Sequence, residues 1–384
     1  MIAGSPHHYR QLGREQSKSD SLIDAALDQA SRVESQGLAA ILTLNHLAKR
    51  TGVSYYYLRT IVSRQRDPYK DLVLRRRNGR KMRAISMPDP PLMEVQRWML
   101  RRVVGKIPTH PASYAYETGS SIRSCAIRHA GARWLVKLDL ENFFESIDER
   151  RVFRIFNDLG YVPLVAFELA RLCTRSAIHA GHIDSGRFAG NARKRVIAEY
   201  SKPVLGFLPQ GAPTSGALAN LVAHDLDIVF SDLARRERMV YTRYADDLTF
   251  SSIEEFDRSR SVRLIDSVRK CVQGAGFSLH EKKTRIIPPG GRKLVLGLLV
   301  DRDPVRLSRA TRSRIVENVR GVEKFGLADH VSHRGFSSID GFVRHLSGLI
   351  AFAMDVEPEW AGVMGGRWRD ALRVNHWLDL SDLT

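Results

Sequence analysis

The segment Val240-Tyr241-Thr242-Arg243-Tyr244-Ala245-Asp246-Asp247-Leu248-Thr249-Phe250-Ser251 places two adjacent carboxylates between two short, mainly apolar runs. Runs of this length, rich in β-branched and aromatic residues, predict two strands that meet in a tight turn at the acidic pair. An Asp-Asp pair in a turn is by itself ordinary turn chemistry. A further apolar run, at residues 134–139, ends in a third carboxylate, Asp139. The pattern predicts a sheet with three carboxylates at one edge.

Such a group of carboxylates points to metal chemistry. Three like charges at one sheet edge repel one another unless cations bind there. Hard oxygen ligands of this kind suit Mg²⁺, which binds a few carboxylates together with substrate phosphates. Two such ions about 4 Å apart can activate a hydroxyl and stabilise a leaving pyrophosphate. Asp139, Asp246 and Asp247 are therefore the candidate ligands.

The composition limits the class of protein. The chain has 384 residues and a net charge of +18, and 43% of its residues are hydrophobic. This is an ordinary globular balance, and the basic excess predicts a polyanionic partner, either nucleic acid or an acidic membrane surface. The cysteines, Cys125, Cys173 and Cys271, form no CxxC pair, which argues against a disulfide framework or a cysteine-rich zinc module. No apolar run is long enough to span a bilayer and no signal core is evident, so we expect a soluble, cytoplasmic protein.

The N-terminal part is expected to be helical. Residues 1–38 are polar with one weakly amphipathic stretch, and residues 42–62 read as a helix, a turn at Gly52 and a second helix. That spacing fits a DNA-binding helix-turn-helix. Helical pairs that pack on a neighbouring domain are far commoner, and we favour such a pair here.

The remaining elements follow from turn signals and periodicity. Two strands are expected in a hairpin that turns at Asn78-Gly79. The prolines at 88–91 are expected to stop the chain before a helix. The other expectations are helices at 93–104, 218–230, 254–274 and from 308 onward, one strand at 294–300, and a basic surface insertion at 175–203.

Several segments resemble, in order and spacing, the motifs of reverse transcriptases, over about residues 40–355. The segments are Arg77-Asn78-Gly79-Arg80-Lys81-Met82-Arg83-Ala84-Ile85, Gln96-Arg97-Trp98, Asp139-Leu140-Glu141-Asn142-Phe143-Phe144-Glu145-Ser146-Ile147, Leu208-Pro209-Gln210-Gly211-Ala212-Pro213-Thr214-Ser215, Tyr244-Ala245-Asp246-Asp247 and Gly276-Phe277-Ser278-Leu279-His280-Glu281-Lys282-Lys283-Thr284.

Within that superfamily the Gln-Gly-Ala-Pro-Thr-Ser loop is similar to that of bacterial retron enzymes. Three positions depart from the retron pattern: Cys125 stands where those enzymes typically have Asn, Leu296 where they have Thr, and Gly216 where they have Pro. The resemblance is therefore to a divergent retron enzyme or a related phage-defence reverse transcriptase. Because Leu296 lacks the hydroxyl of Thr, we expect RNA contacts elsewhere, partly at Arg193, Lys194 and Arg195.

The resemblance implies an α+β fold in the form of a right-hand polymerase. It would have fingers, a palm with an antiparallel sheet backed by helices, and a helical thumb. We expect a helical N-terminal extension at 1–68, fingers and palm at 69–300, and a basic helical thumb at 301–384.

The resemblance also implies roles for individual residues. Two Mg²⁺ ions would be held by Asp139, Asp246, Asp247 and the carbonyl of Leu140. The residues implied at the nucleotide are Lys81, Arg83, Phe144, Gln210, Gly211 and Lys283, and those implied at primer and template are Tyr244, Arg309 and Arg312. Phe144 would exclude a 2′-hydroxyl, whereas Phe143 is expected to point the other way on a strand. For Lys283 two roles are left open: it acts near the leaving pyrophosphate, or it caps a strand. A lone histidine such as His129 is more often buried and hydrogen-bonded than a metal ligand.

The implied function is RNA-directed DNA synthesis from dNTPs, with retron-type production of an RNA-linked DNA in anti-phage defence. The implied partners are a structured non-coding RNA template, the DNA product and a defence effector protein. Two alternatives remain open: a defence reverse transcriptase that makes repetitive or template-independent DNA, and a catalytically silent RNA-binding scaffold. A helix-turn-helix regulator would leave most of the chain unexplained.

Overall fold

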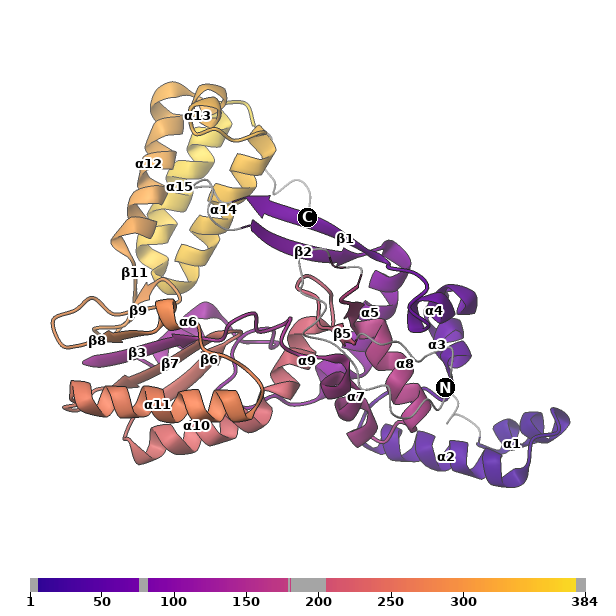
Figure 1. The fold of residues 1–384 in the computed structure, drawn as a ribbon. Coiled ribbons are helices and arrows are strands. Elements are labelled where there is room, and N and C mark those ends of the chain that lie inside the picture. Colours follow the sequence, from indigo (N-terminus) through magenta and orange to yellow (C-terminus); the bar gives the residue numbers. More distant parts are fainter. Residues whose placement is uncertain (1–5, 76–81, 179, 181–204, 378–384) are drawn as a thin grey trace.

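The computed structural model describes residues 6–75, 82–178, 180 and 205–377. In Figure 1, helices α12 to α15 (residues 309–374) rise above a sheet, and the hairpin of β1 (Tyr69–Arg75) and β2 (Met82–Pro88) lies to their right, over the helical part of the molecule. The described helices include none that is long and apolar enough to cross a membrane.

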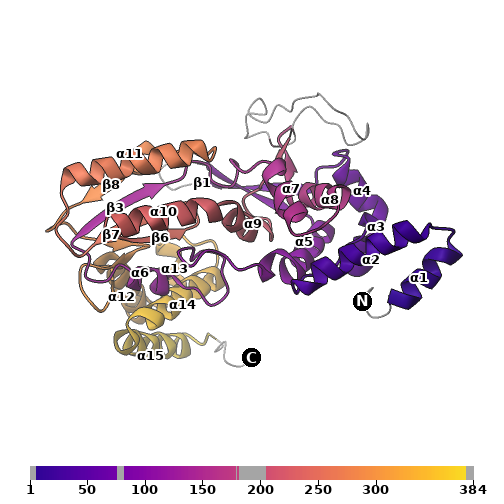
Figure 2. The ribbon, with the colours of Figure 1, turned by 90° about the horizontal axis from the view of Figure 1, so that it is seen from below.

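The parts of the molecule are named here after the palm, fingers and thumb that the resemblance predicts. The palm region contains a four-stranded antiparallel sheet in the order β6-β7-β3-β8. Its strands are β3 (Trp134–Asp139), β6 (Val240–Tyr244), β7 (Asp247–Ser252) and β8 (Arg285–Ile287). Helices α10 (His224–Arg236) and α11 (Arg258–Gly274) cover one face, as Figure 2 shows, and α6 (Ile122–Ile127) lies on the other. Alternate strand residues such as Leu138 and Phe250 are buried in the main core because side chains alternate between faces.

The fingers combine a hairpin with helices. Strands β1 (Tyr69–Arg75) and β2 (Met82–Pro88) pair with Leu72 opposite Ile85, and the expected Asn78-Gly79 turn lies outside the described residues. The prolines start the next helix, whereas the prediction began it after them. Helix α5 (Pro90–Arg102) begins at Pro90, because proline suits the first helical turn, and the side chain of Asp89 caps its N-terminus. The other helices here are α7 (Glu149–Asp158), α8 (Pro163–Cys173) and α9 (Ser215–Val222).

The N-terminal helices are α1 (Pro6–Glu15), α2 (Asp20–Ser35), α3 (Leu44–Thr51) and α4 (Tyr55–Val62). Gly52, with φ +70°, ends α3 as the sequence predicted. The apolar faces of α3 and α4 are buried against α5 and α8, in one core with the palm. This packing confirms the interpretation of a helical pair docked on its neighbour.

The thumb packs around a second hydrophobic core, which also includes Ala126, Ala132 and Leu135 from the palm region. It consists of α12 (Arg309–Phe325), α13 (Leu327–His333), α14 (Ile339–Val356) and α15 (Pro358–Val374), with β9 (Leu294–Val295), β10 (Leu298–Leu299) and β11 (Arg306–Leu307) at its base. The prediction of one strand at 294–300 was wrong, because positive φ angles at Leu296 and Gly297 fold it into a hairpin. The helix expected at 218–230 is two helices, α9 and α10, which meet at Ala223.

The basic insertion is only partly described. Strands β4 (Arg175–Ser176) and β5 (Gly206–Phe207) pair at its ends, while Arg193, Lys194 and Arg195 lie outside the described residues. The prediction placed Arg175 in a surface insertion, and for this residue it was wrong. Arg175 is buried and forms ion pairs with Asp67 and Asp71.

Candidate active site

The predicted carboxylates meet at one end of the palm sheet. Asp139, the last residue of β3, lies directly opposite Asp247, the first residue of β7. Residues opposite each other in an antiparallel pair project from the same face with Cβ atoms about 5 Å apart. Asp246 lies in the turn beside them, so the three side chains that the sequence singled out are brought together. Tyr244, the last residue of β6, lies opposite Asp247 and projects from the same face.

Lys283 supplies the counter-charge at this site. Its Nζ lies 2.7 Å and 2.8 Å from the two carboxylate oxygens of Asp139, which is 95% buried. Burial, with the charges of Asp139 and Asp247, raises the pKa of Asp246, and Lys283 partly offsets this rise. The three carboxylates thus crowd negative charge at this end of the sheet, and Lys283 pairs directly with one of them. Neither expected role of Lys283 included this ion pair.

The donor set suits a divalent cation. In the part of the chain that the structure describes, no three His, Cys, Asp or Glu side chains converge tightly enough to enclose one ion. Asp139 and Asp247 nevertheless offer hard oxygen ligands on one face, with Asp246 in the adjoining turn, and Mg²⁺ characteristically takes a few carboxylates and completes its shell with water or phosphate oxygens. An open, partial protein shell therefore fits this ion.

A buried ion pair supports the turn at Ala245 and Asp246 from beneath; this turn, which carries the predicted catalytic carboxylates, is called the catalytic turn. Arg243 and Asp227 are 1% and 0% exposed, and Nε and Nη2 of Arg243 donate to the two Asp227 oxygens at 2.8 Å and 2.7 Å. The remaining N–H groups donate to Asn220, to Ser113 and, at 3.3 Å, to the carbonyl oxygen of Ala245. All five donors of the guanidinium are used. Sequence reasoning missed this network, because its members are far apart in the chain.

His129 braces the same hairpin from the opposite face. Its ring nitrogens lie 2.7 Å from the hydroxyls of Thr242 on β6 and Ser251 on β7. Cys125 donates to Thr242 as well. Burial lowers the pKa of His129 to about 3, so the ring is neutral at ordinary pH. The expectation of a buried, hydrogen-bonded histidine is confirmed.

The aromatic pair after Asp139 does not continue a strand. Residues 141–146 form turns, and Phe143 and Phe144 are both buried with ring centroids 5.5 Å apart. The expectation that they face opposite ways on a strand was therefore wrong, because the chain leaves the sheet at Leu140. Phe143 packs on Phe277, whereas the ring of Phe144 meets Tyr116.

The Gln210-Gly211 loop lies against the fingers. The carbonyl oxygen of Gln210 accepts from the backbone N–H of Ser86 at 2.8 Å. Gly211 has φ +113°, and a Cβ there would lie 2.5 Å from Cγ2 of Ile85. Glycine is thus required for the close approach to β2. Lys81 and the side chain of Arg83 lie outside the described residues.

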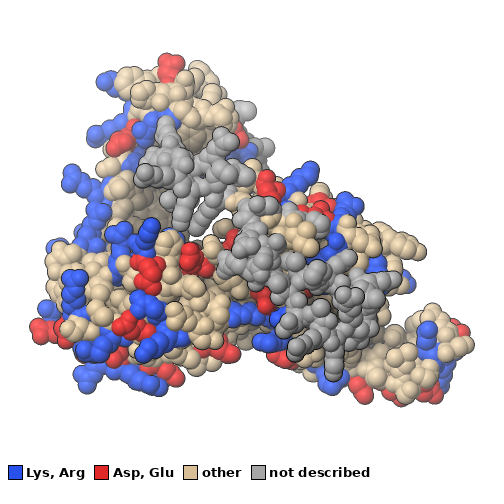
Figure 3. Space-filling model, in the orientation of Figure 1, with Lys and Arg blue, Asp and Glu red and all other residues tan. Residues whose placement is uncertain are grey.

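The two thumb arginines differ. Arg312 donates to Glu357 through Nε at 2.8 Å, and its guanidinium lies 5.1 Å from the Trp360 ring centroid, so its charge is already engaged. Arg309 is exposed at the start of α12. Figure 3 shows Lys and Arg side chains along the outer side of the thumb and over the palm.

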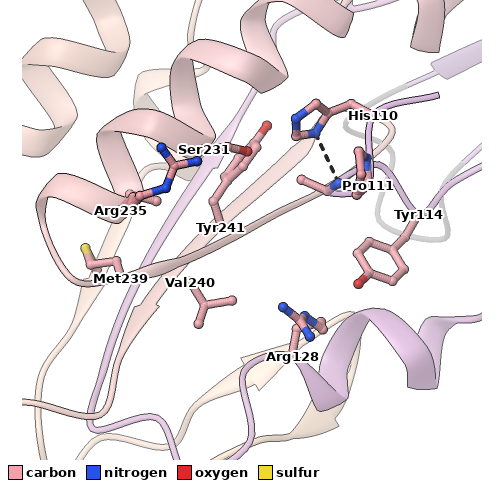
Figure 4. A pocket seen from close by; sticks show the side chains of 11 residues that line it. His110, Pro111, Tyr114, Arg128, Ser231, Arg235, Met239, Val240 and Tyr241 are labelled. Atoms are coloured by element: carbon pink, nitrogen blue, oxygen red, sulfur yellow. Dashed lines mark hydrogen bonds between the residues drawn. The ribbon is translucent and has the colours of Figure 1, made fainter.

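A cavity of about 490 Å³ lies elsewhere, at the outer edge of β6. Figure 4 shows Arg128, His110 and Tyr114 around it, with Arg235 on α10. None of the three carboxylates lines this cavity, so it is distinct from the catalytic turn.

Comparison with known proteins identifies relatives of this chain. Residues 75–305 match the family of reverse transcriptases (RNA-dependent DNA polymerases). The chain is 33% identical to the retron Mx162 reverse transcriptase of Myxococcus xanthus over 88% of its own length and 69% of that protein's. It is 33% identical to the retron Mx65 enzyme of the same organism, over 90% and 75% of the two chains, and 27% identical to the retron Ec86 enzyme of Escherichia coli, over 85% and 89%.

Among solved structures, telomerase from Candida albicans in complex with a fragment of telomeric RNA aligns with a TM-score of 0.39 and 11% identity, over 83% of this chain and 62% of that one. This likeness is too remote to support an argument. The family match covers the whole palm, including Asp139, Asp246 and Asp247. The chain therefore belongs to the retron family of reverse transcriptases and is an RNA-directed DNA polymerase, which uses an RNA template and dNTPs to make DNA.

Proposed function

We propose that this enzyme makes an RNA-linked DNA on a structured non-coding RNA by two-metal catalysis, as part of an anti-phage defence system. The observation that carries the catalytic part is that Asp139 lies opposite Asp247 on one face of the palm sheet, with Asp246 in the adjoining turn. The family supports the template and the substrates. The structured RNA and a defence effector protein stay predictions from the resemblance.

The metal proposed is Mg²⁺, held as two ions by Asp139, Asp246, Asp247 and the carbonyl of Leu140. When bound, such ions lower the pKa of the attacking hydroxyl and stabilise the charge that develops on the leaving pyrophosphate. The raised pKa of Asp246 reflects the same crowding of negative charge that a cation relieves. Binding of cations would keep this carboxylate ionised.

Lys283 is proposed as a movable counter-ion. Its ammonium group donates to both carboxylate oxygens of Asp139. Its side chain is 46% exposed, so it can change rotamer and leave Asp139 without disturbing the core. If Asp139 held a cation, Lys283 would be free to reach the triphosphate, where a lysine neutralises phosphate as a point charge. This role combines the ion pair in the structure with the expected position near pyrophosphate.

The nucleotide is proposed to lie between the catalytic turn and the fingers. Phe144 would lie beneath the sugar and exclude a 2′-hydroxyl, and Gln210 would contact the nucleotide from its loop. Lys81, Arg83 and Gly211 complete the predicted nucleotide residues, and Tyr244 and Arg309 are proposed at primer and template. Arg312 is a weaker candidate for the duplex, since Glu357 already holds it.

The experiment that tests the biological role is sequencing of nucleic acid that co-purifies with the enzyme. A branched RNA–DNA molecule is expected, absent from the Asp246→Asn/Asp247→Asn variant. Repetitive or non-templated DNA would favour the other kind of defence enzyme. RNA without DNA in both preparations would favour a silent scaffold and contradict the proposal.

The proposed role of Phe144 in excluding ribonucleotides has a separate test. Phe144→Ala should lower the preference for dNTPs over NTPs by about tenfold or more, because the space beneath the sugar opens. Phe143→Ala is the matched control, since that ring packs on Phe277 instead. Single-nucleotide incorporation with dATP and ATP measures the preference. An unchanged preference in an active Phe144→Ala enzyme would assign the gate to another residue.

A further inference from the structure

Tyr116 has an unusual conformation for an aromatic residue. Its φ is +60°, a region that L residues other than Asn and Asp rarely adopt. Its side chain is also unusually accessible, with 57% of the residue exposed. Strained backbone of this kind persists only where the surroundings impose it, and it clusters at ligand sites.

The surroundings that impose it are the network beneath the catalytic turn. The carbonyl oxygen of Ala115 accepts from Nδ2 of Asn220 at 2.7 Å, and the Oδ1 of the same amide accepts from Arg243. The hydroxyl of Ser113 accepts from the other end of the Arg243 guanidinium. One buried arginine therefore fixes both the loop before Tyr116 and the carbonyl of Ala245.

The ring of Tyr116 lies between two elements of the nucleotide region. It meets Phe144 edge to face, with centroids 5.9 Å apart and an interplanar angle of 69°. On its other side it lies on Gly216, in the first turn of α9: a Cβ built there would be 2.4 Å from Cγ of Tyr116. No larger residue at 216 is compatible with this ring position. The glycine that departs from the usual retron proline is thus explained by the ring that it accommodates.

We propose that Tyr116 is a nucleotide-contacting residue, the second aromatic wall of the dNTP site beside Phe144, and that Gly216 is the positioning residue that admits its ring. This inference rests on the proposed nucleotide site. The exposed face of the ring offers apolar surface to the sugar and base of the incoming dNTP. Aromatic side chains supply such contact at low conformational cost.

The test uses two variants that should both fold. Tyr116→Gly suits the positive φ, so its melting temperature should stay close to that of the wild type. In Gly216→Ala the added Cβ must displace Tyr116, and circular dichroism checks that this variant keeps its helical content. Each should raise the KM for dNTP about 3- to 10-fold with little change in kcat, since a contact made equally in the ground and transition states is lost. Tyr56→Ala, which removes an 80% exposed tyrosine on α4, is the control and should change neither.

The double variant sharpens the result. If Gly216 acts only through the ring, Tyr116→Gly/Gly216→Ala should show no larger effect than Tyr116→Gly alone. Additive effects would overturn the role of Gly216. An unchanged KM in Tyr116→Gly, with an active wild type, would overturn the contact.

A second measurement separates this inference from the proposed function. Calorimetric titration of dATP with Mg²⁺ into enzyme bound to a dideoxy-terminated primer on RNA requires no turnover. Weaker binding by Tyr116→Gly supports the contact. Equal affinity of wild type and variant contradicts it, whereas failure of the wild type to extend an ordinary primer would count against the proposed function alone.

Discussion

Two tight hairpins in this enzyme place a non-glycine residue at positive φ, and they are supported differently. In the β6–β7 hairpin, Ala245 has φ +55° and its carbonyl accepts from the buried Arg243. In the β9–β10 hairpin at the base of the thumb, Leu296 has φ +50° and is followed by Gly297 at +88°. The first turn is fixed by a charged network, whereas the second relies on Gly297 and on the packing of Leu296 against the thumb core. The comparison shows that the turn which carries the proposed metal ligands is the one tied to a buried charged network.

The largest effect on DNA synthesis is expected when the charges of the catalytic turn are removed. Asp246→Asn/Asp247→Asn should lower DNA synthesis by about 10³-fold or more, as loss of a central catalytic group does. The fold should persist, because the crowding that raises the pKa of Asp246 is relieved. Primer extension and thermal melting measure the two. Asp225→Asn, whose side chain is fully exposed, is the control, and retained extension by the double variant would refute the catalytic assignment.

The second prediction breaks the support of that turn. Arg243→Met should destabilise the protein by about 3–5 kcal/mol, because Asp227 is left buried without its partner. Arg243→Met/Asp227→Leu should cost less, since no charge remains buried. Urea unfolding gives the free energies.

The matched control for this pair lies on the same helix as Asp227. Arg235 and Asp232 on α10 form an exposed ion pair, with side chains 78% and 44% accessible, and such pairs contribute less than about 1 kcal/mol. If Arg243→Met costs no more than Arg235→Met, the network does not support the hairpin as described.

The third prediction concerns acid. The pKa of His129 is lowered to about 3 by burial, whereas in the unfolded chain it is about 6.5. Between these values the unfolded state binds the proton and the folded state does not. The free energy of unfolding should therefore fall as pH drops below 6.5, by about 1.4 kcal/mol per pH unit from this group.

His129→Gln should flatten that dependence, measured as unfolding free energies between pH 4 and 7. The exposed His333→Gln is the control and should leave the slope as it is. Equal slopes in wild type and His129→Gln would show that the imidazole does not stay neutral between β6 and β7.

The smallest effect on stability is expected in the β9–β10 hairpin at the base of the thumb. Two consecutive positive φ angles favour Asn-Gly, so Leu296→Asn should stabilise the protein by less than about 1 kcal/mol. Thermal melting measures the change, with Leu296→Ala as the control for lost side-chain packing. A destabilised Leu296→Asn enzyme would mean that packing of Leu296 on the thumb core outweighs the backbone gain.

Local pattern predicted most of the elements and failed where one or two residues redirect the chain. Strands β3, β6 and β7 follow from their apolar runs, and the helical pair around Gly52 follows from periodicity. The turn at Leu296-Gly297 was missed because leucine is not a turn signal. The helix break at Ala223 was missed for the same reason, since nothing in its composition distinguishes it from a helix interior.

The sequence by itself determined the chemistry: the identity and order of Asp139, Asp246 and Asp247, which local strand patterns bring to a sheet edge. Only the tertiary structure decided what surrounds them. Lys283 lies 144 positions from Asp139, and Ser113 lies 130 from Arg243, so no local pattern links these partners. Their pairing is decided by strand register and by the cost of burying an unpaired charge, and both act only once the whole core has formed.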